Sequence, residues 1–484
     1  MMPADFTALL PFLILTGAVV AVLLAITVVR NHRLTAGLTM AGLALAFAAL
    51  PVALSVAPRA VTPLMEVDGF TIFFDGLLIA AAFAAAGFSF GYLERRHIRR
   101  EEFYLLLLTA TLGACILPAS VHFASLFLSL ELLTVSLYGM IAYLRTEPFG
   151  IEAAIKYLIL ASISSAFLLF GAALIYTDRG TLVLSRILLP DSAAAGTLHP
   201  VLMVAGLGMV LVGIGFKLAV VPFHMWIPDI YQGAPAPVAG FMATVSKGAV
   251  FAVLIRIFSL YAISSEGGVY VALVVIAAVS MFAGNWLALL QTNVKRLLAY
   301  SSIAHFGYLL VALLAAGPNS VTAAALYLAA YFVAILAAFG VIATLSGSGG
   351  EAQELDDYRG LFWRRPWAAF VLTAAMLSLI GIPLTAGFIG KAYLLLAGLG
   401  SAVWLLAVVL IVTSAIGLYY YLRVILMMAQ QPAAENRPGQ SAVLDSRLGN
   451  IVLGALALGI LWLGVYPAPV LEIIQRTASS VLPF

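Results

Sequence analysis

Fourteen stretches of about 20 mostly apolar residues account for most of this chain of 484 residues. One membrane-spanning α-helix needs about 20 such residues, so each stretch is long enough to cross a bilayer. Charged residues make up only 9% of the chain, against about 25% in soluble domains. The sequence therefore predicts an all-α polytopic membrane protein with about 14 transmembrane helices in a single membrane domain, residues 1–484. The predicted spans are 6–29, 34–56, 69–93, 103–118, 121–144, 151–176, 200–222, 235–262, 269–290, 297–316, 320–346, 366–398, 402–428 and 449–468.

Basic residues in the loops are distributed unequally between the two sides that this layout defines. With the N-terminus outside, the inside loops hold 15 lysines and arginines and the outside loops hold four. Because such residues favour cytoplasmic loops, we expect both termini on the periplasmic side. The first stretch lacks the positive region of a cleaved signal peptide, so we expect it to be retained. The inside residues are Arg30, Arg33, Arg95, Arg96, Arg99, Arg100, Arg145, Lys295, Arg296, Arg359, Arg364, Arg365, Arg423, Arg437 and Arg447, and the outside ones are Arg59, Arg179, Arg186 and Arg476.

Cofactor and metal motifs are missing from the sequence. Cys115 is the only cysteine, and no CxxC or Cys/His cluster could hold zinc or an iron–sulfur cluster. There is also no GxGxxG or Walker-type motif for a nucleotide, and no basic patch with aromatic residues for nucleic acid. We therefore expect no cofactor, metal or nucleic-acid site in this chain.

Five basic residues remain inside the predicted helices: Lys156, Lys217, Lys247, Arg256 and Lys391. Four of the five lysines are thus intramembrane, together with one central acid, Glu131. A charge at the bilayer centre costs at least about 2.5–3.5 kcal/mol, so such groups usually face a bundle interior or a wet cavity. Lys156 and Arg256 lie near enough to helix ends to reach the surface instead.

A fixed ion pair between Glu131 and one lysine is an alternative use of these charges. The excess of lysines over this single acid argues against it. Loss of solvent favours a neutral amine and a nearby carboxylate favours a charged one, so buried lysines can take up and release protons. We therefore interpret these groups as a proton path.

Two helix interruptions each lie near a lysine. Pro222 follows Lys217 in GIGFKLAVVPFHMWIPD, and Pro383 precedes Lys391 in LSLIGIPLTAGFIGKAY. A proline removes a backbone donor and clashes with the preceding turn. A single proline often makes only a kink, but two interruptions beside lysines are typical of discontinuous helices at an ion pathway.

Two histidines are further candidates for proton transfer near neutral pH. His224 follows the first interruption and His305 lies inside a helix, although a hydrogen-bonded core histidine is the alternative for each. Among the longer loops, 177–199 could include an amphipathic surface segment, and 347–365 and 429–448 are expected to be solvated.

The two interruptions also indicate an internal repeat. Helices 4–8 and 9–13 form two five-helix units, with broken helices 7 and 12 each fourth in its unit, and units of odd helix number have inverted topology. The predicted divisions are three N-terminal helices (1–100), a first five-helix repeat (101–262), a second (263–428) and a C-terminal helix (429–484).

Three ordered motifs resemble one family. They are FKLAVVPFHMWIPDIYQGAPAPVAGFMATVSKGAVF (216–251), QTNVKRLLAYSSIAHFGYLLVAL (291–313) and IGIPLTAGFIGKAYL (380–394). They resemble the antiporter-like membrane subunits of respiratory complex I, the NADH:quinone oxidoreductase. The segment YQGAPAPV with a lysine on the twelfth helix is most similar to subunit N, the mitochondrial subunit 2 type.

The resemblance implies roles for individual residues. Glu131 would be the fifth-helix glutamate, Lys217 the seventh-helix lysine that pairs with it, Lys247 the central eighth-helix lysine, and Lys391 the twelfth-helix group toward the exit. Lys156, His224 and His305 would be further members of a hydrophilic axis. Changes in the pairing of Glu131 with Lys217 would then move protons.

The resemblance also implies an assembly and a location. FMN, iron–sulfur clusters and quinone are expected in other subunits, and the partners are the M and L types, the small K, J, A and H types and the peripheral arm. The location would be a bacterial cytoplasmic (inner) membrane. A subunit of a multisubunit cation/proton antiporter or of a membrane-bound hydrogenase remains open, as does a structural scaffold.

Overall fold

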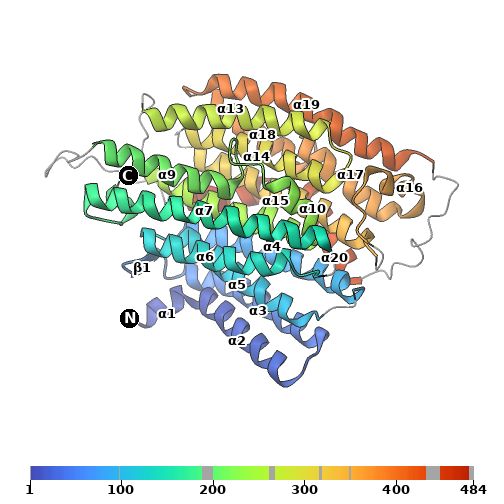
Figure 1. Cartoon of the computed structure of the whole chain (residues 1–484), viewed down its shortest axis with the longest axis horizontal. Coiled ribbons are helices and arrows are strands. Elements are labelled where there is room, and N and C mark those ends of the chain that lie inside the picture. Colours follow the sequence, from blue (N-terminus) through green and yellow to red (C-terminus); the bar gives the residue numbers. More distant parts are fainter. Residues whose placement is uncertain are drawn as a thin grey trace.

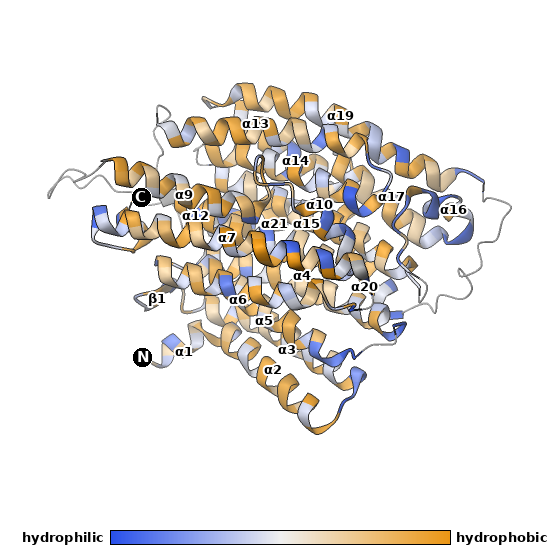
Figure 2. Ribbon diagram, viewed as in Figure 1, coloured by the Kyte–Doolittle hydropathy of each residue, from blue (hydrophilic) through white to orange (hydrophobic). Residues whose placement is uncertain are grey.

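Long helices that run side by side make up almost the whole of the computed structural model (Figure 1). The structure describes residues 2–96, 99–145, 147–187, 200–260, 267–315, 319–347, 350–399, 401–431 and 447–478. Most of the predicted loop 429–448, and residues 188–199 of the loop 177–199, lie outside this part of the chain. The hydrophobic residues cover the helices, and hydrophilic residues gather toward their ends, above all around α16 (Figure 2).

The N-terminal unit contains three spanning helices and a small hairpin. Its elements are α1 (Pro3–Ala8), α2 (Leu10–Val28), α3 (His32–Leu54), β1 (Arg59–Thr62), β2 (Met65–Val67) and α4 (Gly69–Glu94). The two strands pair antiparallel, with Arg59 opposite Val67. This hairpin has no counterpart in the predicted layout, because its seven strand residues are too few for a periodic signal.

The remaining elements lie in the two stretches predicted as repeats and in the C-terminal stretch. Residues 101–260 form α5 (Glu101–Ala119), α6 (Phe123–Ile141), α7 (Pro148–Arg179), α8 (Leu184–Ile187), α9 (Pro200–Leu218), α10 (Ile227–Gly233), α11 (Ala236–Phe241), the π-helix η1 (Met242–Ser246) and α12 (Lys247–Leu260). Residues 268–429 form α13 (Gly268–Leu289), α14 (Val294–Ala315), α15 (Ser320–Leu345), the 3₁₀-helix η2 (Leu355–Tyr358), α16 (Leu361–Arg364), α17 (Pro366–Ile380), α18 (Ala386–Leu399) and α19 (Trp404–Ala429). The last helices are α20 (Arg447–Val465) and α21 (Ala468–Ala478), so the predicted single C-terminal helix is followed by a second, short one.

The predicted fold class is confirmed. Among the described residues, thirteen helices are long and apolar enough to cross a membrane. The shorter apolar helices α17 and α18 together occupy the remaining predicted span, 366–398. The chain is therefore a multi-pass α-helical membrane protein. The division into two inverted repeats stays a prediction.

One side of the molecule holds most of the arginines of the connecting segments, and we call it the arginine-rich side. It comprises the helix ends joined by segments 29–31, 95–100, 142–147, 290–293 and 346–360. Arg30 pairs with Glu102 there, and Arg96 pairs with Glu147. The β-hairpin and α21 lie on the opposite side, as the alternation of the spans requires.

Helices at the centre of the bundle are the most buried. The α14 span is completely enclosed by other helices, and so is 94% of the helix formed by α11, η1 and α12. By contrast, only about a third of α2 is enclosed, since its apolar outer face has no other helix over it. Polar groups on α12 and α14 are therefore enclosed by protein and held away from lipid. Irregular backbone and charged groups are tolerated at membrane depth in such enclosed places.

Both predicted interruptions are present. Helix α9 ends at Leu218, Ala219 has a φ of 56°, and the chain resumes a helix only at α10. Helix α17 ends at Ile380, its C-cap Gly381 has a φ of 89°, and α18 begins at Ala386. The structure thus breaks the chain where the sequence predicts it, between Lys217 and Pro222 and between Ile380 and Lys391.

Candidate functional site

The first group of buried polar residues lies between α6, α7 and α9. Glu131 of α6 accepts a hydrogen bond of 2.5 Å from the Ser165 hydroxyl on α7. Lys217, at the end of α9, donates from Nζ to the Thr134 hydroxyl at 2.7 Å. Thr134 lies one helical turn from Glu131, so both groups face the same region. Within the described residues Glu131 and Lys217 form no ion pair with each other, although their charges interact through space.

The second group surrounds Lys247. This residue is 2% exposed and follows the π-helix η1, a local irregularity that the sequence reading missed and that is frequent at functional sites. Its Nζ donates to Ser302 Oγ on α14 at 2.8 Å and lies 4.7 Å from the centre of the Phe306 ring. The Tyr331 hydroxyl donates to the same Ser302 oxygen at 2.9 Å.

His305 connects this group with the next. It lies one turn beyond Ser302 on α14 and is buried. Its Nδ1 and Nε2 atoms share hydrogen bonds of 2.5 and 3.0 Å with the hydroxyls of Tyr327 and Tyr421. The imidazole also interacts electrostatically with both Lys247 and Lys391.

Lys391 lies at the second interruption. Its Nζ donates at 2.7 Å to the carbonyl oxygen of Ile380, the last residue of α17. That carbonyl has no partner within its own helix, and a cation at a helix C-terminus also interacts favourably with the helix dipole. The amine lies 5.2 Å from the centre of the Tyr308 ring, whose hydroxyl accepts from Asn285 at 2.8 Å.

These three groups share one chemical property. Each buried amine donates to a neutral hydroxyl or carbonyl oxygen rather than to a carboxylate. A neutral oxygen holds the amine in place without adding a charge that would fix its protonation state. Hydroxyl and imidazole groups beside the amines can both donate and accept a proton. Each group can therefore take up and release protons locally. We call their titratable members together the buried axis: Glu131, Lys217, Lys247, His305 and Lys391.

Comparison with known proteins identifies the relatives of this chain. The model of the transmembrane subunits of NADH:quinone oxidoreductases and Mrp antiporters matches residues 120–417. The chain belongs to this family. A chain of respiratory complex I from Thermus thermophilus is 35% identical, with a TM-score of 0.81, and the match covers 96% of this chain and 98% of the other. This antiporter-like membrane subunit thus resembles that chain along almost its whole length.

Two further complexes contain chains of the same fold. A chain of the membrane-bound sulfane sulfur reductase, an archaeal respiratory membrane complex, is 25% identical with a TM-score of 0.85, and 99% of this chain and 98% of that one are covered. A chain of the Mrp complex from Dietzia sp. is 20% identical with a TM-score of 0.84, covering 100% and 98%. The antiporter-like fold is therefore shared by more than one kind of membrane complex.

Two further residues predicted for the hydrophilic axis of this antiporter-like subunit are Lys156 and His224, and their place in the axis stays a prediction. The side chain of Lys156 is 42% exposed at the arginine-rich side and pairs with Glu152 and Asp229 at 2.7 and 2.8 Å, as expected for a lysine near enough to a helix end to reach the surface. Asp229 also pairs with Arg296. The buried His224 lies in the first interruption, and its Nδ1 atom has no hydrogen-bond partner among the described residues.

Arg256 belongs to a buried ion pair. Its guanidinium donates to Asp68 Oδ1 and to the Pro118 carbonyl, both at 2.8 Å, and both charged side chains are less than 10% exposed. Asp68 is the N-cap of α4, where it also accepts from the Thr71 backbone amide. The arginine therefore ties α12 to the start of α4 and to the end of α5.

From the sequence we expect Glu131 to be the one central acid of the membrane helices, but the structure has a second acid inside a helix. Asp75 lies two turns into α4, is 1% exposed and contacts the Cys115 thiol. Its Oδ1 atom has no hydrogen-bond partner in the part of the chain that the structure describes. A single aspartate in TIFFDGLLIAAAF is visible in the sequence, so a search of every span for acids would have found it.

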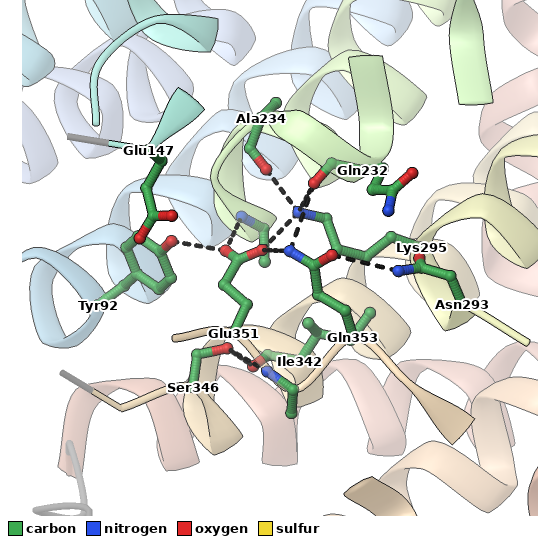
Figure 3. Close-up of polar contacts among 12 residues, drawn as sticks. Tyr92, Glu147, Gln232, Ala234, Asn293, Lys295, Ile342, Ser346, Glu351 and Gln353 are labelled. Atoms are coloured by element: carbon green, nitrogen blue, oxygen red, sulfur yellow. Dashed lines mark hydrogen bonds and ion pairs between the residues drawn. The ribbon is translucent and has the colours of Figure 1, made fainter. Parts of the chain in front are cut away.

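A buried ion pair on the arginine-rich side was also missed (Figure 3). The predicted inside-loop residue Lys295 is fully enclosed and pairs with Glu351 at 2.5 Å. Glu351 lies in segment 347–365, which was expected to be solvated, yet its side chain is only 6% exposed. The correction has a physical reason, because hydrogen bonds from the surrounding elements replace solvent around both charges.

The surroundings of Glu351 stabilise its charged form. Burial acts to raise the pKa of this carboxyl, but the charge of Lys295 and hydrogen bonds from Lys295, Tyr92 and the Ala236 amide outweigh it, so the pKa is lowered. The Tyr92 hydroxyl donates at 2.6 Å and the Ala236 amide at 2.8 Å, both to Oε1. Glu351 is therefore ionised at neutral pH.

Clusters that could bind a metal were also sought. In the residues that the structure describes, no group of three or more histidines, cysteines, aspartates and glutamates lies close enough to hold a metal ion.

Proposed function

We propose that this chain is the proton-translocating subunit N (mitochondrial subunit 2 type) of a bacterial NADH:quinone oxidoreductase. In this proposal quinone reduction elsewhere in the complex drives protons along the buried axis. The observation that carries it is the pattern of amines held by neutral oxygens, with two of the three at helix interruptions. The 35% identity to a complex I chain over 96% of this chain supports the choice of complex.

At the first interruption, Lys217 could exchange one hydrogen-bond partner for another. Lys217 donates to Thr134 while Glu131 accepts from Ser165, so acid and amine are near but separate. Movement of Lys217 by about one turn of α6 would bring it to Glu131. A neighbouring carboxylate stabilises the charged amine, so this exchange of partners would change the affinity of Lys217 for a proton.

The rest of the assembly follows from the same proposal. The enzyme is a translocase in which this chain carries no redox centre, and FMN, iron–sulfur clusters and quinone belong to other subunits. The partners are the M, L, K, J, A and H types and the peripheral arm. The arginine-rich side would face the cytoplasm of a bacterium, with both termini on the periplasmic side.

Purification of the native assembly tests the choice of complex. We expect this chain to co-purify with NADH-oxidising and quinone-reducing subunits. In proteoliposomes that contain the assembly, NADH oxidation should move protons across the bilayer, in a direction set by the orientation of the complex. A Lys217→Gln variant should oxidise NADH more slowly and move fewer protons, because the amine at the interruption is lost. Sodium-dependent proton exchange without redox subunits would instead identify a cation/proton antiporter, and the Mrp likeness in fold makes this the alternative.

A further inference from the structure

The Lys295–Glu351 pair lies at a junction between two helices. Helix α10 ends at Gly233, with Ala234 as its C-cap, and the helix that carries Lys247 begins at Ala236. Lys295 Nζ donates to the carbonyl oxygens of Gln232 and Ala234, at 2.9 and 2.6 Å. The Glu351 carboxylate accepts from the amide of Ala236 at 2.8 Å. Figure 3 shows both charged groups converging on this turn.

Each charge faces the helix end that suits its sign. The last carbonyls of a helix have no partner within it and carry partial negative charge, whereas the first amides carry partial positive charge. Lys295 meets the carbonyl end of α10, and Glu351 meets the amide end of the helix Ala236–Phe258. The pair therefore does more than join two loops, since it supplies the caps of both helices at the junction.

The junction also lies at the start of the helix that carries Lys247. The helix Ala236–Phe258 is continuous, so Lys247 is eleven residues, or about 16 Å, from the capped end. Between them lies the π-helix η1, an irregular turn of a kind that is frequent at functional sites. Any shift of Ala236 along the axis would be felt at the contact between Lys247 and Ser302.

We propose that Lys295 and Glu351 are positioning residues that fix the start of the Lys247 helix, and that they thereby hold Lys247 against Ser302. We call these two residues, with turn 232–236, the junction clasp. The proposal rests on the proposed function of Lys247. The clasp joins segments that are remote in sequence, because Lys295 begins α14, Glu351 follows α15, and Tyr92 of α4 donates to Glu351.

The decisive variants are Glu351→Gln, Lys295→Gln and the exchange of both charges, Lys295→Glu with Glu351→Lys. Backbone hydrogen exchange within residues 236–246 should rise about tenfold in each single variant, the size expected for losing hydrogen bonds to a charged group. Exchange in α2 and α3, which are remote from the clasp, should not change. Proton translocation per assembled complex should fall at least about threefold while the complex accumulates.

The exchanged pair separates the clasp from a simple ion pair. Reversal restores the mutual attraction, but it places a carboxylate against the Gln232 and Ala234 carbonyls and an amine against the Ala236 amide. We therefore expect no recovery of exchange protection or translocation. Recovery to wild-type levels would overturn the proposal, because it would mean that only the attraction between the two charges matters.

Controls keep the other outcomes informative. Asp356→Asn removes an exposed charge pair with Arg359 from the same loop and should change neither readout. If Glu351→Gln fails to accumulate, Tyr92→Phe decides: faster exchange confined to 236–246 supports the clasp, and unchanged or general exchange refutes it. Wild-type exchange and translocation in Glu351→Gln would also refute it. Normal translocation in Lys247→Gln would count against the proposed function, whereas the exchange data would still decide the clasp.

Discussion

Buried cations in this protein have two kinds of partner, and the difference bears on what they can do. Arg256 and Lys295 each face a carboxylate, which stabilises the charged form. Lys217, Lys247 and Lys391 instead donate to hydroxyl or carbonyl oxygens. Loss of a proton from the first kind would leave its carboxylate partner buried without a paired cation, whereas the direct partners of the second kind carry no charge. At the residue scale, the partner separates structural cations from candidates for proton transfer.

Replacement of Arg256 by methionine tests the structural class. Asp68 would remain buried without its cation, which should lower the free energy of unfolding by about 3–5 kcal/mol. The double variant Arg256→Met/Asp68→Asn should recover part of this loss, and translocation per folded complex should stay near wild type in both. Thermal denaturation of the detergent-solubilised complex gives the first quantity. Normal stability with lost translocation would place Arg256 in the proton path instead.

At the scale of elements, the second interruption depends on the close approach of α18 to α17. A methyl group on Gly387 would lie 1.7 Å from the Ser378 carbonyl oxygen, so only glycine fits there. We expect Gly387→Ala to displace α18 with Lys391 and to cost about 1–3 kcal/mol or more. Gly208→Ala in α9 is the matched control, since nothing lies within 4 Å of that methyl position. Thermal denaturation measures the stability of both variants. Equal stability of Gly387→Ala and Gly208→Ala would contradict the close contact between α18 and α17.

Acid should release the junction clasp only well below neutral pH. The pKa of Glu351 is lowered in the folded protein by Lys295, Tyr92 and the Ala236 amide, against the effect of burial. A carboxyl with a lowered pKa contributes stability above its unfolded value of about 4.3, and loses it as the pH falls through the folded value. Tyr92, Arg96, Glu147 and Tyr358 are the other ionisable groups that interact with the pair.

The measurement is hydrogen exchange within 236–246, for wild type and for Glu351→Gln, at a series of pH values corrected for the intrinsic exchange rate. The difference should be constant from about pH 7 to pH 5 and should disappear only below about pH 4. A difference that vanishes between pH 7 and 6 would show that the pair titrates near neutrality.

For the whole molecule, the sequence predicts the parts that depend on apolar length and on proline. The spans, the interruptions near Pro222 and Pro383 and the buried lysines 217, 247 and 391 are visible along the chain. What the sequence does not reveal is which residues of separate loops meet. The sequence predicts the side of the molecule on which Lys295 lies. It does not predict that Lys295 is buried, because the burial depends on Glu351, 56 residues away.

Other differences have the same origin in tertiary contacts. The sequence shows that Lys156 is near enough to a helix end to reach the surface, but not that Asp229 and Glu152 are its partners. The π-helix before Lys247 has no sequence signature, because MATVS is also compatible with an α-helix. The pairing of Glu131 with Lys217 stays a prediction, since the structure has them on separate hydroxyls.

Proton translocation by complexes that carry a Lys247→Gln or a Lys156→Gln variant tests the central claim most directly. Both changes remove one lysine charge, but only Lys247 lies in the buried axis. We expect protons moved per electron to fall clearly in Lys247→Gln, with slower turnover, and to match wild type in Lys156→Gln. If Lys247→Gln pumped as well as wild type, or if both variants lost pumping equally, the buried axis would not be the path.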